Sequence, residues 1–160
     1  MGTQSRRDGF SRCSSEPLAW WVRGALLLVI GGLVGVLVVA ARIHPYREDG
    51  VALRRATHQQ LGLPECGFLK GTGVPCPSCG LTTSFALTIR GDWLNAARAN
   101  WVGLVMVLVC LVLIPWGVAS ALTGRAIGVP SLERAILVGI SCLFVMLMVR
   151  WVFVLWWREG

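Results

Sequence analysis

Three long apolar segments constrain this 160-residue chain more than any other feature. The first is uncharged from Gly24 to Ala41 and the second from Trp101 to Gly124, whereas the third, from Ala135 to Trp157, contains the single charge of Arg150. A helix of about 20 residues crosses the hydrocarbon layer of a bilayer. Arg150 lies near the end of its segment, where a long side chain can reach the lipid headgroups. The sequence therefore predicts three transmembrane helices.

These segments predict an all-α membrane protein with spans at about residues 22–41, 101–122 and 135–156. Residues 1–16 are polar and lack apolar periodicity, which predicts a disordered tail before a single membrane domain, residues 17–160. The first and second spans are joined by the only sizeable extramembrane segment, a cysteine-containing loop at residues 42–100.

Part of this loop has a helical pattern. Asp92 follows Gly91 and predicts the N-cap of a new helix leading into the second span. From Leu81 to Trp93, apolar residues recur every four positions, which is typical of one face of a helix. We expect a short amphipathic helix at the membrane interface. Its apolar face consists of Leu81, Phe85, Ile89 and Trp93.

The chain carries a formal net charge of +7, which comes almost entirely from arginine. Arginines beside a membrane span bind anionic headgroups and influence topology. They are scattered here and are not interleaved with aromatic residues as in proteins that bind single-stranded nucleic acid. The sequence therefore predicts the lipid bilayer as a partner and no nucleic acid. More basic residues lie on the side of the cysteine loop, which favours a cytoplasmic loop.

The segment Cys76-Pro77-Ser78-Cys79-Gly80-Leu81 is the strongest candidate for chemistry. Two thiols three positions apart, just before a helix, are compatible with three interpretations. The helix N-terminus can lower the pKa of the first thiol for redox work. The turn can direct two sulfurs at a tetrahedral metal ion. It can also be a structural turn or a disulfide.

The first two interpretations assign different roles to the same residues. A metal site needs further ligands, and Cys66 and His58 precede the motif at short distances along the chain. The predicted zinc site thus consists of His58, Cys66, Cys76 and Cys79. In a redox protein, Cys76 would be the catalytic nucleophile and Cys79 the resolving thiol.

A resemblance to a known family rests on several motifs together. The stretch from Gly73 to Thr82 is followed by Arg90-Gly91-Asp92, by Ala96-Ala97 and by Asn100. Over roughly residues 60–120, this combination resembles domain of unknown function 2752, a family of small bacterial membrane proteins. The resemblance implies a membrane protein built around the cysteine motif, located in the bacterial inner membrane, and it supplies no reaction.

The chain departs from the family pattern at two positions. Thr83 stands where the family has arginine after its motif threonine, and Trp101 stands where it has proline after its asparagine. The first departure removes a positive charge near the thiols, which would weaken a role in stabilising a thiolate or binding an anion.

Three functional hypotheses follow. The first is a non-enzymatic membrane protein whose CxxC loop forms a structural or metal-stabilised platform for a membrane protein partner or a second copy of the chain. The second is a membrane thiol–disulfide oxidoreductase that uses Cys76 and Cys79. The third is a small transporter or channel subunit, which the shortage of polar residues in the spans disfavours. Whether the protein is an enzyme stays open at this point.

Overall fold

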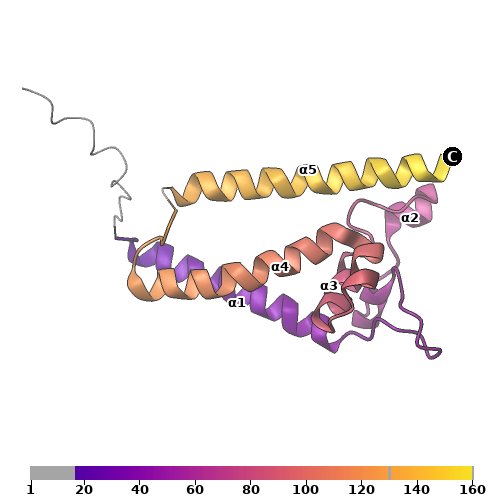
Figure 1. Ribbon diagram of the computed structural model, residues 1–160, viewed down its shortest axis with the longest axis horizontal. Helices are drawn as coiled ribbons and strands as arrows, with labels where there is room; N and C mark the ends of the chain where they lie inside the picture. Colours follow the sequence, from indigo (N-terminus) through magenta and orange to yellow (C-terminus); the bar gives the residue numbers. More distant parts are fainter. Residues whose placement is uncertain (1–16, 130, 160) are drawn as a thin grey trace, which may run out of the picture.

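The computed structural model describes residues 17–129 and 131–159 (Figure 1). The tail predicted at residues 1–16 lies outside the described residues. Within the described ranges the protein consists of helices and loops, with one isolated β-bridge between Tyr46 and Ala52 and no strand. The helices in chain order are α1 (Trp20–Arg42), the 3-10 helix η1 (Thr57–Leu61), α2 (Gly67–Thr72), α3 (Leu81–Ile89), α4 (Trp93–Thr123) and α5 (Leu132–Glu159).

The prediction of an all-helical protein with three membrane-spanning helices is confirmed. Helices α1, α4 and α5 are each long and apolar enough to cross a bilayer. Helix α4 begins eight residues before the predicted span, since Asp92 caps it by accepting a hydrogen bond from the backbone N–H of Asn95 at 3.3 Å. The helical dihedral angles of α4 are interrupted at Asn100, with φ −163° and ψ 102°. The part of α4 before Asn100 is therefore a separate short helix of about two turns, outside the apolar segment.

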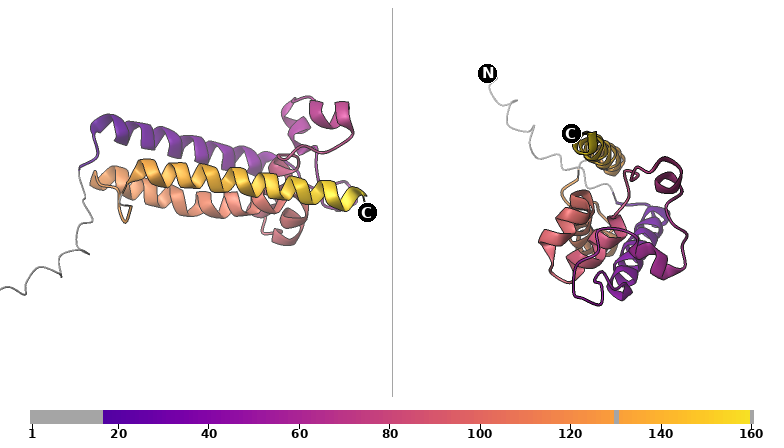
Figure 2. Two further views of the ribbon diagram at one scale, coloured as in Figure 1. Left: turned by 90° about the horizontal axis from the view of Figure 1, so that it is seen from above. Right: turned by 90° about the vertical axis from the view of Figure 1, so that its right-hand side faces the viewer.

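The three long helices run lengthwise, and the smaller elements gather at one end (Figures 1 and 2). Helix α1 packs against α4, where Gly117 lets Ile30 approach so closely that a Cβ at Gly117 would lie 2.9 Å from it. The Arg23 guanidinium donates to the Ala121 carbonyl at 2.9 Å, at the end of this pair far from the cysteine loop. Helix α5 lies beside them, and none of its most apolar window is buried.

The short helix between the first two spans is confirmed as α3, and it is largely buried. Phe85 packs with Ala40 of α1 and Val107 of α4. Leu87, which lies outside the four-residue apolar series, is fully buried in a second cluster with Ala96 and Ala99 of α4. Packing on both sides fixes α3 between α1 and α4, so the segment just before it has a defined position.

Candidate functional site

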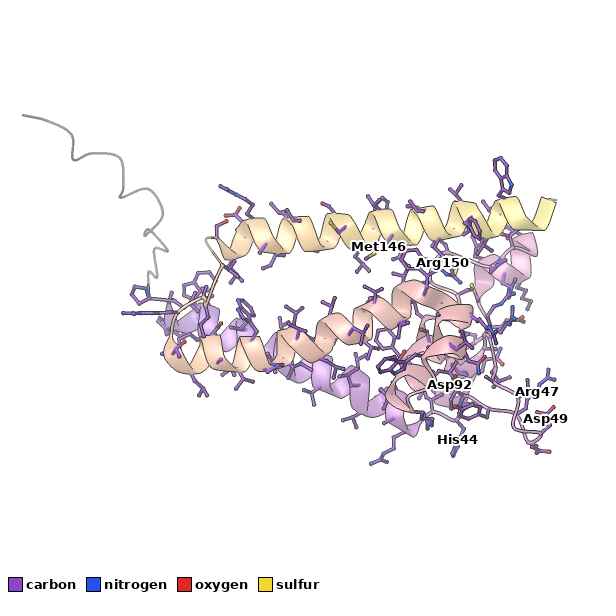
Figure 3. The ribbon with its side chains drawn as sticks, in the orientation of Figure 1. His44, Arg47, Asp49, Asp92, Met146 and Arg150 are labelled. Atoms are coloured by element: carbon purple, nitrogen blue, oxygen red, sulfur yellow. The ribbon has the colours of Figure 1, made fainter. Side chains whose placement is uncertain are left out.

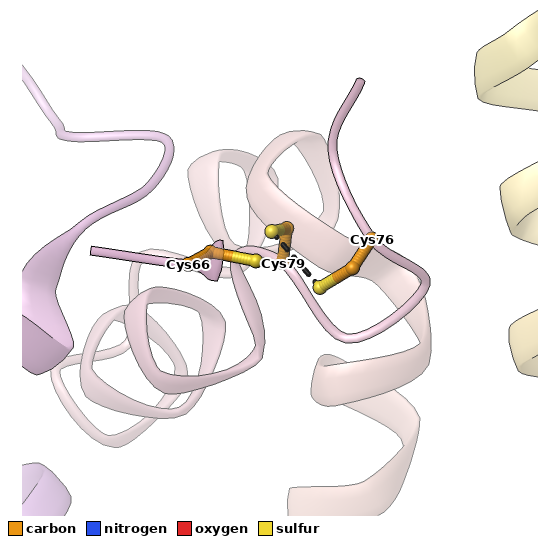
Figure 4. A group of neighbouring side chains, drawn as sticks. All are labelled: Cys66, Cys76 and Cys79. Carbon is orange, nitrogen blue, oxygen red and sulfur yellow. Dashed lines mark hydrogen bonds between the residues drawn. The ribbon is translucent and has the colours of Figure 1, made fainter. Parts of the chain in front are cut away.

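Three cysteines come together just before α3 (Figure 4). The Sγ atoms of Cys66, Cys76 and Cys79 all lie within 4.8 Å of one another, and each residue is half-buried. Cys66 precedes α2, whereas the other two lie in the turn before α3. The remaining described cysteines, Cys110 and Cys142, lie in α4 and α5, outside this cluster.

Local backbone geometry produces the turn that carries Cys76 and Cys79. The N–H of Cys79 donates to the carbonyl of Cys76 at 3.1 Å, which closes the turn. Gly80 follows with φ +87°, a left-handed conformation that glycine adopts without steric cost. A Cβ at this position would lie 2.7 Å from the Ala99 carbonyl oxygen and 3.0 Å from that of Arg54. Gly80 thus allows both the turn and its close contact with α4.

Asn100 connects this turn to the start of the second span. Its Nδ2 donates to the Cys79 carbonyl at 3.3 Å. Its Oδ1 accepts from the backbone N–H groups of Val102 at 3.1 Å and Gly103 at 3.4 Å, as an N-cap does. The side chain is almost fully buried. The break in α4 therefore creates a second helix start that is bonded to the cysteine turn.

Arg150 holds the third span against the same turn. Its guanidinium lies on the side of α5 that faces the loop (Figure 3) and donates to the carbonyls of Pro77 at 3.1 Å, Cys79 at 3.3 Å and Ala99 at 3.1 Å. The neighbouring Trp151 donates its indole N–H to the Pro75 carbonyl at 3.0 Å. The charged group inside an apolar segment is thus used to bond α5 to the motif.

The two thiols of the motif differ in pKa, which is lowered for Cys76 and raised for Cys79. Burial raises the pKa of Cys76, but hydrogen bonds to Ser78, Cys79 and Cys66 outweigh it and lower the pKa to about 7. Burial and the hydrogen bond to Cys76 raise the pKa of Cys79 to about 12. The two Sγ atoms lie 3.0 Å apart: Cys76 donates to Cys79 when both are thiols, and Cys79 donates to the Cys76 thiolate once Cys76 has ionised.

His58, the fourth predicted metal ligand, is outside the sulfur cluster. It lines the same cavity of about 330 Å³ as the three cysteines. Its Nε2 forms a hydrogen bond with the Pro64 carbonyl at 3.2 Å. The structure thus brings together three of the four predicted ligands and leaves the histidine nearby.

Thr83, where the family has arginine, has a structural contact of its own. Its hydroxyl lies 2.9 Å from that of Thr57 in η1, and both residues are almost fully buried. This hydrogen bond attaches η1 to α3 beneath the cysteine cavity. An arginine here would need a different packing of η1.

The sequence interpretation missed two residues of the site, Asn100 and the bonding role of Arg150. A polar residue immediately before an apolar run was a signal for Asn100, since asparagine is a preferred N-cap. An arginine inside an apolar segment was a signal for Arg150, but snorkelling to the headgroups explained it equally well. Neither pattern identifies the carbonyl partners, which come from distant parts of the chain.

Three helices able to span a bilayer, with a cysteine cluster at one end, define an integral membrane protein. Residues 66–114 match the family described as protein of unknown function (DUF2752). The predicted resemblance is therefore confirmed for this segment, which contains the three clustered cysteines, α3 and the first part of α4. No curated protein and no solved structure matches the chain.

Proposed function

We propose that Cys66, Cys76 and Cys79 bind a zinc ion and that the metal fixes the loop as a platform for a partner protein at the membrane surface. The observation that carries this proposal is the convergence of three sulfurs within 4.8 Å from two separate segments. A redox pair needs only two cysteines, whereas a structural zinc site needs four ligands, so a third thiol beside the pair favours a metal site.

The donor set and its spacing suit zinc. Zinc prefers thiolate and imidazole ligands in a tetrahedron, and zinc–sulfur bonds of about 2.3 Å place the sulfurs about 3.8 Å apart. Small side-chain adjustments bring the observed cluster to that spacing. Zinc also ionises its thiol ligands, so Cys79 would lose its proton on binding.

His58 is the candidate fourth ligand. It lines the same cavity as the sulfurs, and its ring is held by one hydrogen bond to the Pro64 carbonyl at 3.2 Å. Turning the ring from that carbonyl toward the sulfurs would complete a Cys₃His site. If His58 stays on Pro64, a water molecule takes the fourth position, as in zinc sites that keep an open position.

The platform role rests on where the cluster lies. The turn that carries it is bonded to α4 through Asn100 and to α5 through Arg150. Helix α2, which follows Cys66, is mostly exposed. Its half-buried Leu69 lines the cysteine cavity, and the ring centroids of Phe68 and Trp151 lie 6.0 Å apart. A metal linking Cys66 to the turn would fix α2 to the end of the helix bundle where the turn is bonded to α4 and α5.

Metal analysis of the full chain, purified in detergent, tests the proposal. We expect about one zinc per chain in the wild type and none in Cys76→Ser/Cys79→Ser, because a single remaining thiol cannot retain the ion. Cys66→Ser should lower zinc affinity strongly and His58→Ala moderately, as measured by competition with a chromophoric chelator. The matched control is Cys110→Ala/Cys142→Ala, which removes two thiols from the spans and should keep the zinc.

Two results would contradict the metal proposal. One is wild-type protein that stays free of metal after expression and reconstitution with zinc. The other is zinc that is lost equally in Cys110→Ala/Cys142→Ala, which would show binding without the cluster.

A second candidate function, disulfide exchange, is favoured by the 3.0 Å distance between Cys76 and Cys79. The Cys76 thiolate would attack one sulfur of a partner's disulfide, break that S–S bond, form a mixed disulfide and release the other sulfur as a thiolate. Cys79 would then lose its proton and attack Cys76, closing a Cys76–Cys79 disulfide and releasing the second thiolate. The partner gains two electrons and two protons, and the pair is oxidised.

Thiol alkylation of reduced, chelator-treated protein measures the difference in pKa between Cys76 and Cys79. We expect the alkylation rate of Cys76 to rise with pH, with a midpoint of about 7, because the reactive thiolate forms as pH passes its lowered pKa. Cys79 should stay unreactive across this range, since its pKa is raised to about 12. Ser78→Ala should move the Cys76 midpoint to higher pH, because the thiolate loses a hydrogen bond.

Equal alkylation of both cysteines, with a common midpoint near the ordinary thiol value, would contradict this assignment. Peptide mapping by mass spectrometry identifies which sulfur reacted. The measurement uses protein with the Cys142→Ala substitution, because Cys142 is exposed on α5 and would also be alkylated.

A further inference from the structure

A second cavity, of about 690 Å³, lies between the cysteine turn, the start of α4 and the end of α5. Arg54 and Arg55 line it from the loop, Arg98 from α4 and Arg150 from α5. None of its nine lining residues is acidic. Four positive charges thus converge on one concave site, from segments that are far apart in the sequence.

These arginines have few acidic neighbours: Asp92 lies close enough to attract the charge of Arg98 but forms no ion pair with it. Within residues 17–129 and 131–156, none of the four forms an ion pair, and Arg54 and Arg55 have no side-chain hydrogen bond. Arg98 donates only to the Asn95 side-chain oxygen, at 3.4 Å. Arg55 lies close enough to Arg150 for the two charges to repel each other. Arg150 uses both terminal nitrogens on carbonyls and retains further N–H groups. Gathering such charges is unfavourable unless an anion enters.

The position and lining of the cavity indicate the kind of anion. Phe153 and Val154 of α5 form an apolar wall one turn beyond Arg150, at the end of the third span. A site with guanidinium groups on one side and a lipid-facing helix on the other matches an amphiphile with a phosphate head and apolar tails. The volume is within the range of small-molecule sites.

We propose that this arginine-lined cavity binds the phosphate headgroup of an anionic phospholipid from the surrounding leaflet. Arg54, Arg55 and Arg98 contact the phosphate, and the acyl chains leave along Phe153 and Val154. Arg150 joins the two sites, since it lines this cavity and also bonds to the carbonyl of Cys79. The lipid site does not depend on a metal at the cysteines.

Native mass spectrometry of the full chain released from detergent tests this site, with phosphatidylglycerol as the probe and zwitterionic phosphatidylcholine for comparison. We expect Arg54→Gln/Arg55→Gln/Arg98→Gln to weaken phosphatidylglycerol binding about tenfold or more, since each basic contact contributes appreciably to headgroup binding. The matched control, Arg42→Gln/Arg47→Gln/Lys70→Gln, removes three charges outside the cavity at the same end of the molecule and should bind like the wild type.

Each outcome decides the proposal. Loss of binding in the cavity variant alone supports it. Equal loss in both triple variants would show a general charge effect and overturn it, as would equal binding of both lipids by the wild type. Displacement of phosphatidylglycerol by inorganic phosphate at equal concentration would assign the cavity to a soluble phosphate compound instead of a lipid. Retained binding in a cavity variant that melts normally would also overturn it.

Discussion

Replacing Gly80 with alanine is expected to destabilise the protein by about 2–5 kcal/mol. The new Cβ would lie 2.7 Å from the Ala99 carbonyl oxygen and 3.0 Å from that of Arg54. Both atoms belong to the backbone, so no side chain can rotate to make room. The φ of +87° adds a further cost for any residue with a Cβ. The cysteine turn would have to move away from α4.

Gly50→Ala separates the cost of the steric overlap from the cost of the left-handed backbone conformation. Gly50 has a similar φ of +79°, but nothing lies within 4 Å of its ideal Cβ, so only the conformational cost of about 1–2 kcal/mol applies. Unfolding by denaturant in a fixed detergent compares the two variants. Equal losses of stability would show that the close approach to Ala99 is relieved cheaply. We also expect Gly80→Ala, and not Gly50→Ala, to lower zinc affinity, because Cys79 immediately precedes Gly80.

The membrane spans could be predicted from the sequence because they depend on composition over about 20 residues and not on tertiary contacts. The N-cap at Asp92 was equally local and is confirmed by its bond to Asn95. The second helix start, at Asn100, was not foreseen. Its signal is a single residue, and its meaning depends on the Cys79 carbonyl, 21 positions earlier in the chain.

The cysteine cluster was only partly accessible to sequence reasoning. The spacing of Cys76 and Cys79 indicates that both sulfurs can meet, because a short turn limits their separation. The approach of Cys66 depends on how the chain between Cys66 and Cys76 folds, which residue types alone do not determine. The position of His58 could not be predicted from its spacing either: it lines the same cavity as the cysteines, but its side chain forms a hydrogen bond with the Pro64 carbonyl.

The burial of α3 was likewise beyond a periodicity argument. The four-residue series indicates a helix, and its Phe85 packs with Ala40 and Val107. The prediction of one apolar face was wrong for Ile89 and Trp93, which are both exposed, and Trp93 belongs to α4. Leu87 lies off the series and is fully buried, because α4 covers the other side of α3 with Ala96 and Ala99. The helix that precedes the second span thus folds back on it, and this arrangement positions the cysteine turn.

Arg150→Met is expected to destabilise the association of α5 with the cysteine turn by about 2–4 kcal/mol, since three hydrogen bonds from a charged group are lost. The carbonyls of Pro77, Cys79 and Ala99 would be left without this donor. Helix α5 has few other attachments to the bundle, because none of its most apolar window is buried. Hydrogen–deuterium exchange should therefore rise in residues 75–81, and the melting temperature in detergent should fall.

Arg134→Met is the matched control, because it makes the same change at the other end of α5, where the arginine is exposed and forms no side-chain hydrogen bond within the described residues. It should leave both measurements unchanged. Arg150→Lys separates charge from geometry: an ammonium group keeps the charge but cannot span three carbonyls as a planar guanidinium does. We expect an intermediate effect. If Arg150→Lys matched the wild type, charge alone would hold α5, and if Arg150→Met matched Arg134→Met, the three bonds would contribute nothing to its position.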